Sequence, residues 1–501
     1  MPPRRSAGAL RQGAGSVSGN QRCQISLQRP VGRRGLELRE GSEDPVRLSR
    51  LASQAGVTVK GTDPELPLVI RVDSRETQKG EGFVALHGTK VDGHRFIPDV
   101  LAKGASLIVC EAAAYQEEWS SLYPQCAFVL TPERCEFGLA SLASAYLRSL
   151  EHLRETIAIT GSVGKTSAKN DTKALLEDYF KLHVAGGNYN TLIGCAVTVL
   201  AAPTDTEVML LEMGANHRGE IAAMVSYLPP TIAAITEVAP AHLESFASLE
   251  GVLQAKSEIL ASKNLRCAVI NGDNEMLCTR AEELGLPEVI RFGRCGEVLF
   301  ARERLSWEKD HFTVRAILTG LDGLSFNLSL PLAGVHQLYP LCCAIAIAGR
   351  LGLSSREIAA SLPKCRNSAG RGEVRLSESG AAILDECYNA SPAAVKASLA
   401  AMDSADIPGR RFLILGEMLE LGTASVSEHG RIFERALQVS DLLYLFGEEW
   451  KNVEGAADYY YDSIDALIEA VDRTRPGEGD VILVKGSRGN HLERVVKALE
   501  L

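Results

Sequence analysis

The chain has 501 residues, of which 46% are hydrophobic and 23% are charged, a balance typical of globular proteins with a buried core. Its net charge of −10 argues against a nucleic-acid binder, because such proteins present basic faces. No apolar run approaches the ~20 residues that cross a bilayer, and this length predicts about three domains. The twelve cysteines are scattered without ligand spacing, as is typical of reduced thiols. We expect a soluble, cytoplasmic monomer.

Residues 1–45 differ in composition from the rest of the chain. They are rich in Arg, Gly, Ser and Gln, contain no lysine and have no acidic residue before Glu37. Such a segment cannot bury enough apolar surface to fold alone, so we expect a disordered basic extension. An extension translated from an upstream start and an organelle transit peptide both fit this composition, whereas a secretory signal does not, because no apolar stretch is present.

The first folded region is expected to span residues 46–150. Apolar runs at residues 68–72 and 82–86 predict strands, and each run leads into a loop of polar side chains. Polar groups gathered at strand ends are a common way for α/β domains to hold a ligand, although solvated turns would look the same. Further strands are predicted at 105–110 and 127–130, and helices at 46–52 and 137–150.

Residues 157–167 read Ile-Ala-Ile-Thr-Gly-Ser-Val-Gly-Lys-Thr-Ser, which predicts a strand, a glycine turn and the start of a helix. The backbone N–H groups of such a turn can surround a phosphate. Lys165 would meet the outer phosphates, and the Thr166 hydroxyl could hold Mg²⁺. Common phosphate loops have four residues between their glycines, whereas two residues separate Gly161 from Gly164. We interpret this stretch as a compact nucleoside triphosphate site.

Two further predicted strands should bring chemical groups to this loop. Residues 209–214 contain Glu212, and residues 233–238 lead to His242. Because the carboxyl ends of parallel strands meet at one edge of a sheet, both side chains are expected beside the phosphate loop. Mg²⁺ prefers oxygen ligands, so Glu212 is the natural ligand, while a structural role for His242 is equally open. The strand at 269–274 ends in amide and carboxylate groups suited to a nucleotide base.

From about residue 363 onward, strand, glycine turn and helix alternate again, as in a doubly wound sheet. The strands are predicted at residues 381–386, 411–416, 442–447 and 481–486. Glycine is common after a strand, and no G-x-G-x-x-G pattern follows any of them, so a dinucleotide site is not supported.

Four motifs resemble the Mur ligase family, the ATP-dependent amide-forming enzymes of peptidoglycan synthesis. They are the compact loop at residues 160–166, Asp-Glu-x-Tyr-Asn-Ala-x-Pro at 385–392, Leu-Gly-Glu-Met-Leu-Glu-Leu-Gly at 415–422, and Val-Lys-Gly-Ser-Arg-Gly at 484–489. The last three resemble the members that add D-alanyl-D-alanine (D-Ala-D-Ala) to UDP-N-acetylmuramoyl-tripeptide (UDP-MurNAc-tripeptide). The resemblance covers residues 46–501.

The resemblance implies a three-domain α/β fold. Its parts would be a small α/β UDP-sugar domain at residues 46–150, a central P-loop ATPase-like domain with a parallel sheet at 151–362, and a C-terminal Rossmann-like domain at 363–501. It also implies a reaction in which the tripeptide carboxylate attacks the γ-phosphate of ATP, giving an acyl phosphate from which the dipeptide amine displaces phosphate. ATP and Mg²⁺ are the implied cofactors.

The resemblance also implies roles for individual residues. Lys256 matches the place of a carbamylated lysine near a metal, with an exposed helical lysine as the alternative. The implied catalytic residues are Lys165, His242 and Lys256, and the implied metal ligands are Thr166, Glu212 and His242. The implied nucleotide contacts are Gly161, Ser162, Gly164, Lys165, Thr166, Ser167, Asn271, Asp273, Arg371 and Asp385. The implied substrate contacts are Ser74, Arg75, Asp92 and His94 for the UDP-sugar, and Asn389, Ser391 and Arg488 for the dipeptide.

Several positions near the expected nucleotide depart from the family pattern. Val163 and Glu237 each stand in place of an asparagine, Ala239-Pro240 replaces Gly-Glu, and Gln337 and Pro340 replace two further asparagines. Gln337 keeps an amide and Pro340 is accepted in a first helical turn, so we expect altered ATP affinity or metal use. Another Mur-type amide ligase, or a nucleotide-binding paralogue with weakened or no ligase activity, is the alternative, since amides that pair with a ligand are costly to lose.

Overall fold

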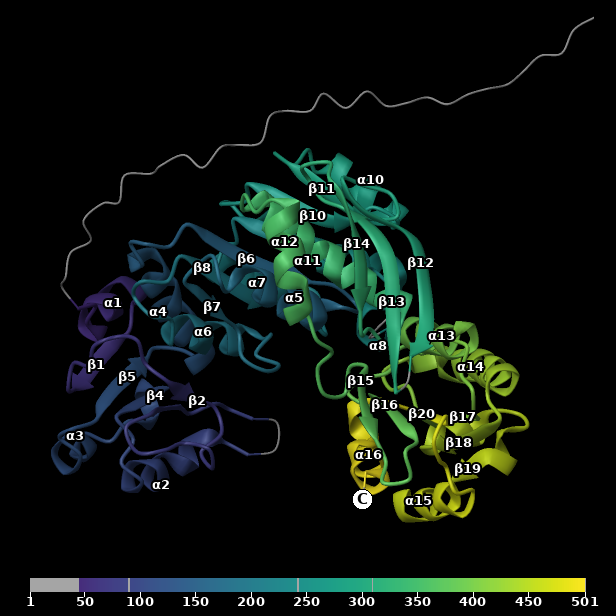
Figure 1. Ribbon diagram of the computed structural model, residues 1–501. Coiled ribbons are helices and arrows are strands. Elements are labelled where there is room, and N and C mark those ends of the chain that lie inside the picture. Colours follow the sequence, from purple (N-terminus) through teal and green to yellow (C-terminus); the bar gives the residue numbers. More distant parts are fainter. Residues whose placement is uncertain (1–44, 89–90, 241–242, 309, 501) are drawn as a thin grey trace, which may run out of the picture. The chain divides into compact units, whose positions relative to one another are not determined.

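The computed structural model describes residues 45–88, 91–240, 243–308 and 310–500, which form three β-sheets with helices beside them (Figure 1). The extension expected at residues 1–45 lies outside the described residues apart from Pro45, and so does His242. Within the described ranges no helix has the length and apolar character that crossing a membrane requires.

The first sheet has five strands in the order β1-β5-β4-β3-β2, with β1 antiparallel and the others parallel. Its strands alternate between two cores, since Leu107 and Val109 face one and Ile108 and Cys110 face the other. Helices α1 and α4 pack in the first core, and α2 and α3 in the second. The elements are β1 (Thr58–Gly61), β2 (Ile70–Arg71), β3 (Gly82–Val84), β4 (Leu107–Glu111), β5 (Ala127–Thr131), α1 (Leu48–Ala55), α2 (Ile97–Ala102), α3 (Glu118–Leu122) and α4 (Cys135–Ser149).

The central sheet has nine strands in the order β14-β13-β12-β11-β10-β9-β6-β8-β7. The strands from β7 to β12 in this order are parallel, and β12, β13 and β14 form an antiparallel meander. The parallel sheet expected here is therefore a mixed sheet. The strands are β6 (Glu155–Thr160), β7 (Leu182–Val184), β8 (Val208–Glu212), β9 (Ile232–Ile235), β10 (Cys267–Asn271), β11 (Val289–Gly293), β12 (Val298–Glu308), β13 (His311–Thr319) and β14 (Ser325–Leu330).

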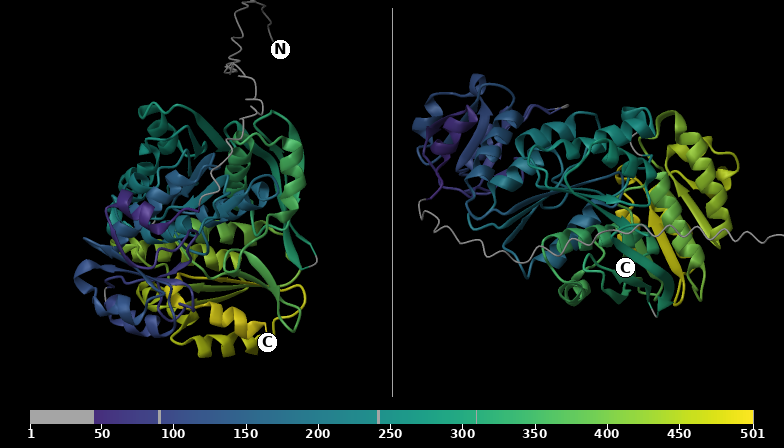
Figure 2. Two further views of the ribbon diagram at one scale, coloured as in Figure 1. Left: turned by 90° about the vertical axis from the view of Figure 1, so that its left-hand side faces the viewer. Right: turned by 90° about the horizontal axis from the view of Figure 1, so that it is seen from above.

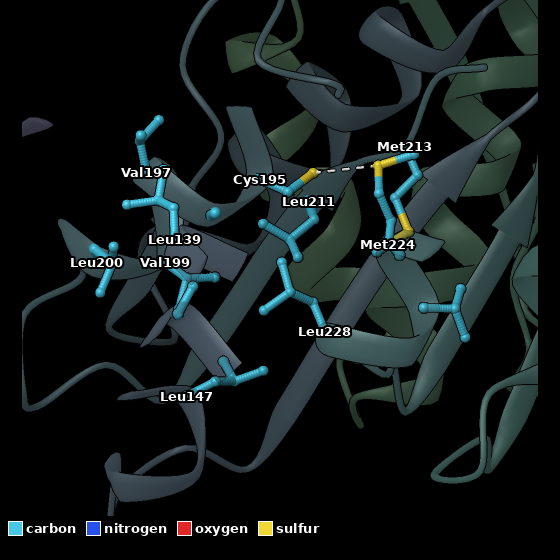
Figure 3. Close-up of a cluster of buried hydrophobic side chains, with 14 of the residues drawn as sticks. Leu139, Leu147, Cys195, Val197, Val199, Leu200, Leu211, Met213, Met224 and Leu228 are labelled. Atoms are coloured by element: carbon cyan, nitrogen blue, oxygen red, sulfur yellow. Dashed lines mark hydrogen bonds between the residues drawn. The ribbon is translucent and has the colours of Figure 1, made fainter. Parts of the chain in front are cut away.

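Helices cover the parallel part of the central sheet on both faces. Side chains of α5 and α11 belong to one buried cluster with the strands, and side chains of α6, α7 and α9 belong to another. Figure 3 shows part of the second cluster, in which Cys195 of α6, Leu211 of β8 and Met224 of α7 lie near one another. The helices are α5 (Lys165–Leu176), α6 (Leu192–Leu200), α7 (Glu220–Tyr227), α8 (Leu243–Phe246), α9 (Leu249–Ser257), α10 (Glu275–Glu283), α11 (Leu338–Arg350) and α12 (Ser355–Ser361).

The third sheet has six strands in the order β15-β16-β20-β17-β18-β19, all parallel except β15 (Figure 1). Figure 2 shows this part of the chain, coloured green to yellow, from two further directions. Helices α13 and α14 pack on one face, and α15 and α16 on the other. The elements are β15 (Glu373–Leu376), β16 (Ala382–Glu386), β17 (Arg411–Gly416), β18 (Leu442–Phe446), β19 (Tyr460–Tyr461), β20 (Val481–Lys485), α13 (Pro392–Ser404), α14 (Ser425–Val439), α15 (Ile464–Arg473) and α16 (Glu493–Leu499). The expected fold class is confirmed, whereas the exact domain limits stay predictions.

Candidate functional site

The loop between β6 and α5 has the geometry of an anion cradle. Gly161 and Gly164 take φ angles of 147° and 83°, which glycine adopts at little cost. A Cβ atom on Gly161 would also lie only 2.1 Å from the Thr236 hydroxyl, so the close approach of two backbones requires glycine there. Because α5 begins at Lys165, the free N–H groups of its first turn and its positive dipole end adjoin the loop.

The same loop is tied to the segment that follows β9. The Thr236 hydroxyl donates to the Val163 carbonyl at 2.5 Å, and the Ser162 hydroxyl donates to the Ala239 carbonyl at 2.9 Å. The Ser162 N–H donates to the Glu237 carbonyl at 2.8 Å. Val163 and Glu237 enter these bonds through their backbone, which every residue type supplies, so both substitutions leave the ties in place.

Lys165 lies at the start of α5 with its amine folded back on the loop. Its Nζ donates to the Gly161 carbonyl at 2.7 Å and to the Ser162 carbonyl at 3.4 Å. Burial lowers the pKa of Lys165, while the negative charge of Glu212 acts in the opposite direction. An anion bound in the loop would stabilise the charged amine and take over its weaker bond to Ser162.

A buried carboxylate lies beside the first turn of α5. Glu212, the last residue of β8, is 1% exposed, and its Oε1 accepts from the Thr166 hydroxyl at 3.1 Å and from Asn190 at 3.2 Å. Its Oε2 has no hydrogen-bond partner among the described residues but lies 3.4 Å from Lys169 Nζ. A hydroxyl and a carboxylate with a free oxygen fit a hard cation such as Mg²⁺. His242, the third expected ligand, lies outside the described residues.

Lys169 is a member of this cluster that sequence reasoning missed. It follows Lys165 by one helical turn on α5, and its Nζ also donates to the carbonyls of Ala185 and Gly187, at 3.1 Å and 2.9 Å. A helical spacing of four residues from Lys165 is the signal that could have pointed to it.

Lys256 of α9 is buried, so its interpretation as an exposed helical lysine is wrong. Its exposed fraction is 2%, its Nζ donates to the Ala215 carbonyl at 3.1 Å, and the ring centre of Phe246 lies 5.4 Å away. Burial, with a smaller contribution from the charge of Lys165, lowers the pKa of Lys256 to about 7. A large part of this amine is therefore uncharged near neutral pH, which is the form that reacts as a nucleophile.

The phosphate loop borders a cavity of about 1180 Å³. Glu212 lines it, as do five of the six positions that depart from the family pattern near the nucleotide, Val163, Glu237, Ala239, Gln337 and Pro340. The other predicted site residues in its wall are Ser162, Gly164, Lys165, Thr166, Ser167, Arg371, Asn389 and Ser391. The substituted positions in the cavity wall and the phosphate loop therefore line the same cavity, as the sequence predicted.

Four predicted nucleotide contacts do not line this cavity: Gly161, whose carbonyl accepts from Lys165, and Asn271, Asp273 and Asp385. Asn271 donates to Glu237 Oε2 at 2.6 Å, and Asp273 accepts from the Tyr339 hydroxyl at 2.8 Å. Asp385 is buried and accepts from the Gly370 N–H at 3.1 Å, which shapes the turn before Arg371. Roles of Asn271 and Asp273 toward the base, and of Asp385 toward the nucleotide, stay predictions.

The substituted polar side chains near the cradle bond to the protein itself. Glu237 accepts from Asn271, from Asn274 and from the Val238 N–H, and burial raises the pKa of its carboxyl group. Gln337 accepts from the Ala333 N–H at 2.7 Å and donates to the Arg371 carbonyl at 3.3 Å. Pro340 is the third residue of α11, where a proline costs no helical hydrogen bond.

The predicted UDP-sugar contacts gather at the carboxyl edge of the first sheet, outside the cavity. Asp92 Oδ1 accepts from the His94 N–H at 3.0 Å and lies 2.7 Å from His94 Nδ1. Arg75 is exposed and forms a bidentate pair with Asp73, and the Ser74 carbonyl accepts from Lys103. Their roles in substrate binding stay predictions.

The predicted dipeptide contacts come from the third sheet and its loops. Ser391 caps α13 by accepting from the Ala394 N–H at 3.4 Å, and Asn389 precedes it. Arg488 is largely exposed, lies 5.9 Å from the ring centre of Tyr388 and does not line the cavity. The structure brings Asn389 and Ser391 to the cavity wall and leaves Arg488 outside it.

Sequence reasoning missed a buried ion pair in the cavity wall. Lys485 Nζ lies 2.9 Å from Glu386 Oε2, and the two residues are register partners at the ends of β16 and β20. Burial acts to raise the pKa of Glu386, but the charges of Lys485 and His336 lower it below the ordinary value. Each residue stands at the end of an apolar strand and inside one of the family motifs at 385–392 and 484–489. Its position in the sequence could therefore have identified it as a site residue.

Comparison with known proteins gives matches along most of the chain. Three family models match: "Mur ligase family, catalytic domain" at residues 69–134, "Mur ligase middle domain" at 159–348 and "Mur ligase, glutamate ligase domain" at 370–488. The UDP-N-acetylmuramoyl-tripeptide–D-alanyl-D-alanine ligase of Escherichia coli (strain K12) is 30% identical over 91% of this chain and 98% of its own length. The enzyme with that name from Mycobacterium tuberculosis (strain ATCC 25618 / H37Rv) is 31% identical over 86% and 91%.

Solved structures give the same likeness. MurF ligase from Thermotoga maritima, in complex with ADP, has 28% identity and a TM-score of 0.73, covering 87% of this chain and 97% of its own. MurF from Acinetobacter baumannii has a TM-score of 0.78 at 24% identity, covering 91% and 99%, and it supports the fold.

Proposed function

This chain belongs to the Mur ligase family of ATP-dependent peptide ligases, and on that premise we propose that it joins D-Ala-D-Ala to UDP-MurNAc-tripeptide. The relatives from Escherichia coli and Mycobacterium tuberculosis that align with most of the chain carry this reaction in their names. One structural observation supports it most directly: Lys165, Thr166 and the buried Glu212 lie together in the wall of one cavity.

The proposed reaction has two steps. A carboxylate oxygen of the tripeptide forms a bond to the γ-phosphorus of ATP, the bond to the β-phosphate oxygen breaks, and ADP leaves. The amine of D-Ala-D-Ala then forms a bond to the acyl carbon, the acyl–oxygen bond breaks, and phosphate leaves as the amine loses a proton. Both steps concentrate negative charge on phosphoryl oxygens, so cationic groups at the loop are what the reaction requires.

The residues of the loop supply that charge. Lys165 would move its amine from the Ser162 carbonyl to the phosphate oxygens, and the N–H groups at the start of α5 would complete the cradle. Thr166 and Glu212 would hold Mg²⁺, because Glu212 Oε2 is buried and accepts no hydrogen bond from a described residue. The metal ion, when bound, neutralises the charge of the transferred phosphoryl group.

Lys256 has the properties that carbamylation requires. An uncharged amine can attack CO₂, so that a nitrogen–carbon bond forms, one proton leaves, and an anionic carbamate results. The low pKa of Lys256, about 7, makes the uncharged form abundant near neutral pH. The carbamate would relieve the burial of a cation and offer oxygens to a metal ion. We propose Lys256 as this modified residue.

One assay tests the ligase function against the alternative of a nucleotide-binding paralogue. The protein is incubated with ATP, Mg²⁺, UDP-MurNAc-tripeptide and D-Ala-D-Ala, and pentapeptide and phosphate are measured together. We expect equal amounts of both products, and neither product when one substrate is left out. Phosphate release that ignores both substrates would show a simple NTPase, and no release would show a binding protein. Replacing the acceptor by UDP-MurNAc-L-alanyl-D-glutamate and D-Ala-D-Ala by a diamino acid tests another Mur-type ligase.

A further inference from the structure

A second cluster of metal-ligand side chains lies at the carboxyl edge of the first sheet. Glu111 is the last residue of β4, and His87 follows β3 by three residues. Because β3 and β4 are parallel neighbours, their carboxyl ends bring the two side chains to the same place. His94 belongs to the 3-10 helix Gly93–Phe96, and the backbone bridge between His87 and Asp92 holds that helix against the end of β3.

The ligand atoms of this cluster lie close together, and one pair has the separation found around a metal ion. His87 Nε2 lies 3.2 Å from Glu111 Oε1, and one ligand atom from each of His87, His94 and Glu111 lies within 4.8 Å of the other two. Two ligands bound at about 2.0–2.1 Å to one tetrahedral ion are about 3.3 Å apart. The His87–Glu111 separation already has this value. His87 Nδ1 lies 3.3 Å from Asp92 Oδ2, so Asp92 faces both histidines, whose ring centres are 4.9 Å apart.

Asp92 orients the more buried of the two histidines. Its Oδ1 lies 2.7 Å from His94 Nδ1, and the side chain of His94 is only 10% exposed. When Nδ1 carries the ring proton and donates it to Asp92, Nε2 carries the lone pair that a metal needs. The Glu111 N–H donates to this Nε2 over 3.3 Å, a long hydrogen bond that a metal–nitrogen bond would replace. In proteins, a histidine that binds a metal through one ring nitrogen usually donates the N–H of its other ring nitrogen to a carboxylate or a similar acceptor.

We propose that His87, His94 and Glu111 bind a divalent transition-metal ion of the Zn²⁺ type, with Asp92 orienting His94. Two imidazoles and one carboxylate suit Zn²⁺, whereas Mg²⁺ prefers six oxygen ligands. The side chains of His87 and Asp92 are 48% and 42% exposed, so solvent reaches the ion and can supply its fourth ligand. This site does not include the proposed Mg²⁺ ligands Thr166 and Glu212, whereas Asp92 and His94 are also predicted UDP-sugar contacts, so the ion would lie at the edge of that predicted subsite.

The ion would connect the segment after β3, the end of β4 and the 3-10 helix. Such a link stabilises the folded state, because an ion that binds only the folded protein shifts the unfolding equilibrium. Zn²⁺ should therefore raise the thermal unfolding temperature of the parent protein, and Mg²⁺ at the same concentration should not raise it through this site.

The test uses the full chain freed of metal with a chelator and titrated with ZnCl₂ in competition with a chromophoric chelator. The parent is compared with His87→Lys and with the control His152→Lys, which changes an exposed histidine between α4 and β6. We expect the parent and the control to bind one more equivalent of Zn²⁺ than His87→Lys. Cysteines could also bind Zn²⁺, but they are the same in all three proteins. The difference in stoichiometry therefore reports only the site that contains His87. Equal stoichiometry and affinity in all three proteins would overturn the proposal.

Asp92→Asn gives a second, milder test, since it keeps the ligands and the shape of the side chain. We expect it to weaken Zn²⁺ binding about 10–100-fold, as loss of an orienting partner does at other metal sites. Co²⁺ bound to the parent should show the visible spectrum of a tetrahedral ion, and this spectrum should be absent from His87→Lys. Unchanged affinity in Asp92→Asn, or a Co²⁺ spectrum that survives His87→Lys, would overturn the assignment. Circular dichroism confirms that each variant is folded.

Discussion

Replacing Lys256 by methionine should make the protein more stable while removing ligase activity. The amine is 2% exposed, and burial lowers its pKa to about 7, whereas an unfolded chain holds a lysine pKa of about 10.4. At a pH between these two pKa values, Lys256 binds a proton in the unfolded state but not in the folded state. The free energy of unfolding therefore rises with pH across this window, and the cost of burying the lysine is largest at the acidic end.

The size of the effect follows from the two pKa values. The burial of Lys256 costs about 4 kcal/mol at pH 7.5 and about 2 kcal/mol at pH 9.0. Methionine avoids this cost but loses the hydrogen bond to the Ala215 carbonyl, which is worth about 1 kcal/mol. The net gain should be about 3 kcal/mol at pH 7.5 and about 1 kcal/mol at pH 9.0. One kcal/mol corresponds to about 2–4 °C in unfolding temperature. The unfolding temperature should therefore rise by about 6–12 °C at pH 7.5 and by about 2–4 °C at pH 9.0.

The assay is thermal unfolding at both pH values in buffer free of CO₂, because carbamylation would convert the amine of the parent into an anion and change the titration being measured. Hydrogen exchange of the α9 amides reports the same change locally. Lys263→Met changes an exposed lysine and is the matched control. It should leave the unfolding temperature unchanged at both pH values. A stability difference between Lys256→Met and the parent that is the same at both pH values would refute the inference that Lys256 is a buried, mostly uncharged amine.

Three further predictions follow from the phosphate loop and the core. Gly161→Ala would place a Cβ atom 2.1 Å from the Thr236 hydroxyl, so calorimetry should show ADP affinity at least ~10-fold weaker. Lys165→Ala should abolish turnover in the coupled assay and leave UDP-sugar binding intact, since only the charge at the phosphates is lost. Leu211→Ala should lower the free energy of unfolding by about 2–5 kcal/mol, because Leu211 is fully buried in the cluster of Figure 3.

Each of these changes has a matched control in the chain. Gly186→Ala meets no atom within 4 Å and should bind ADP as the parent does. Lys173→Ala removes an exposed lysine from the same helix as Lys165 and should keep turnover. Leu122→Ala, at a residue that is 65% exposed, should leave the unfolding temperature nearly unchanged. Retained turnover in Lys165→Ala, ADP binding by Gly161→Ala as tight as that of the parent, or an unaltered unfolding temperature in Leu211→Ala would contradict the corresponding argument.

The phosphate loop could be predicted from the sequence because its conformation depends on residues that are adjacent in the chain. Gly161 and Gly164 have the positive φ angles that the motif requires, and α5 begins at Lys165. The position of Glu212 could also be predicted, since β8 is apolar and its neighbour in the sheet is β6. Parallel pairing then brings the strand end to Thr166 without further information.

The parts that could not be predicted depend on contacts between distant residues. Strands β12 and β13 mix apolar with charged residues such as Arg302 and Arg304, and no strand was predicted there, so the meander is a feature that only the structure shows. The partner of Asn271 is Glu237, a contact between the ends of two different strands that the sequence does not reveal. The spacing of four residues from Lys165 indicates that Lys169 shares a helix face with it, but the contact of Lys169 with Glu212 depends on how α5 packs against β8.

The ties between the phosphate loop and the segment after β9 have a consequence for the kinetics of nucleotide binding. Fixing the backbone of one residue costs about 1–2 kcal/mol of conformational entropy. Since Thr236, Ser162 and Glu237 hold the loop through hydrogen bonds of the protein itself, that ordering takes place during folding. ATP then meets a rigid receptor, so association should be limited by encounter and not by rearrangement of the loop. ADP should likewise dissociate without the loop having to unfold.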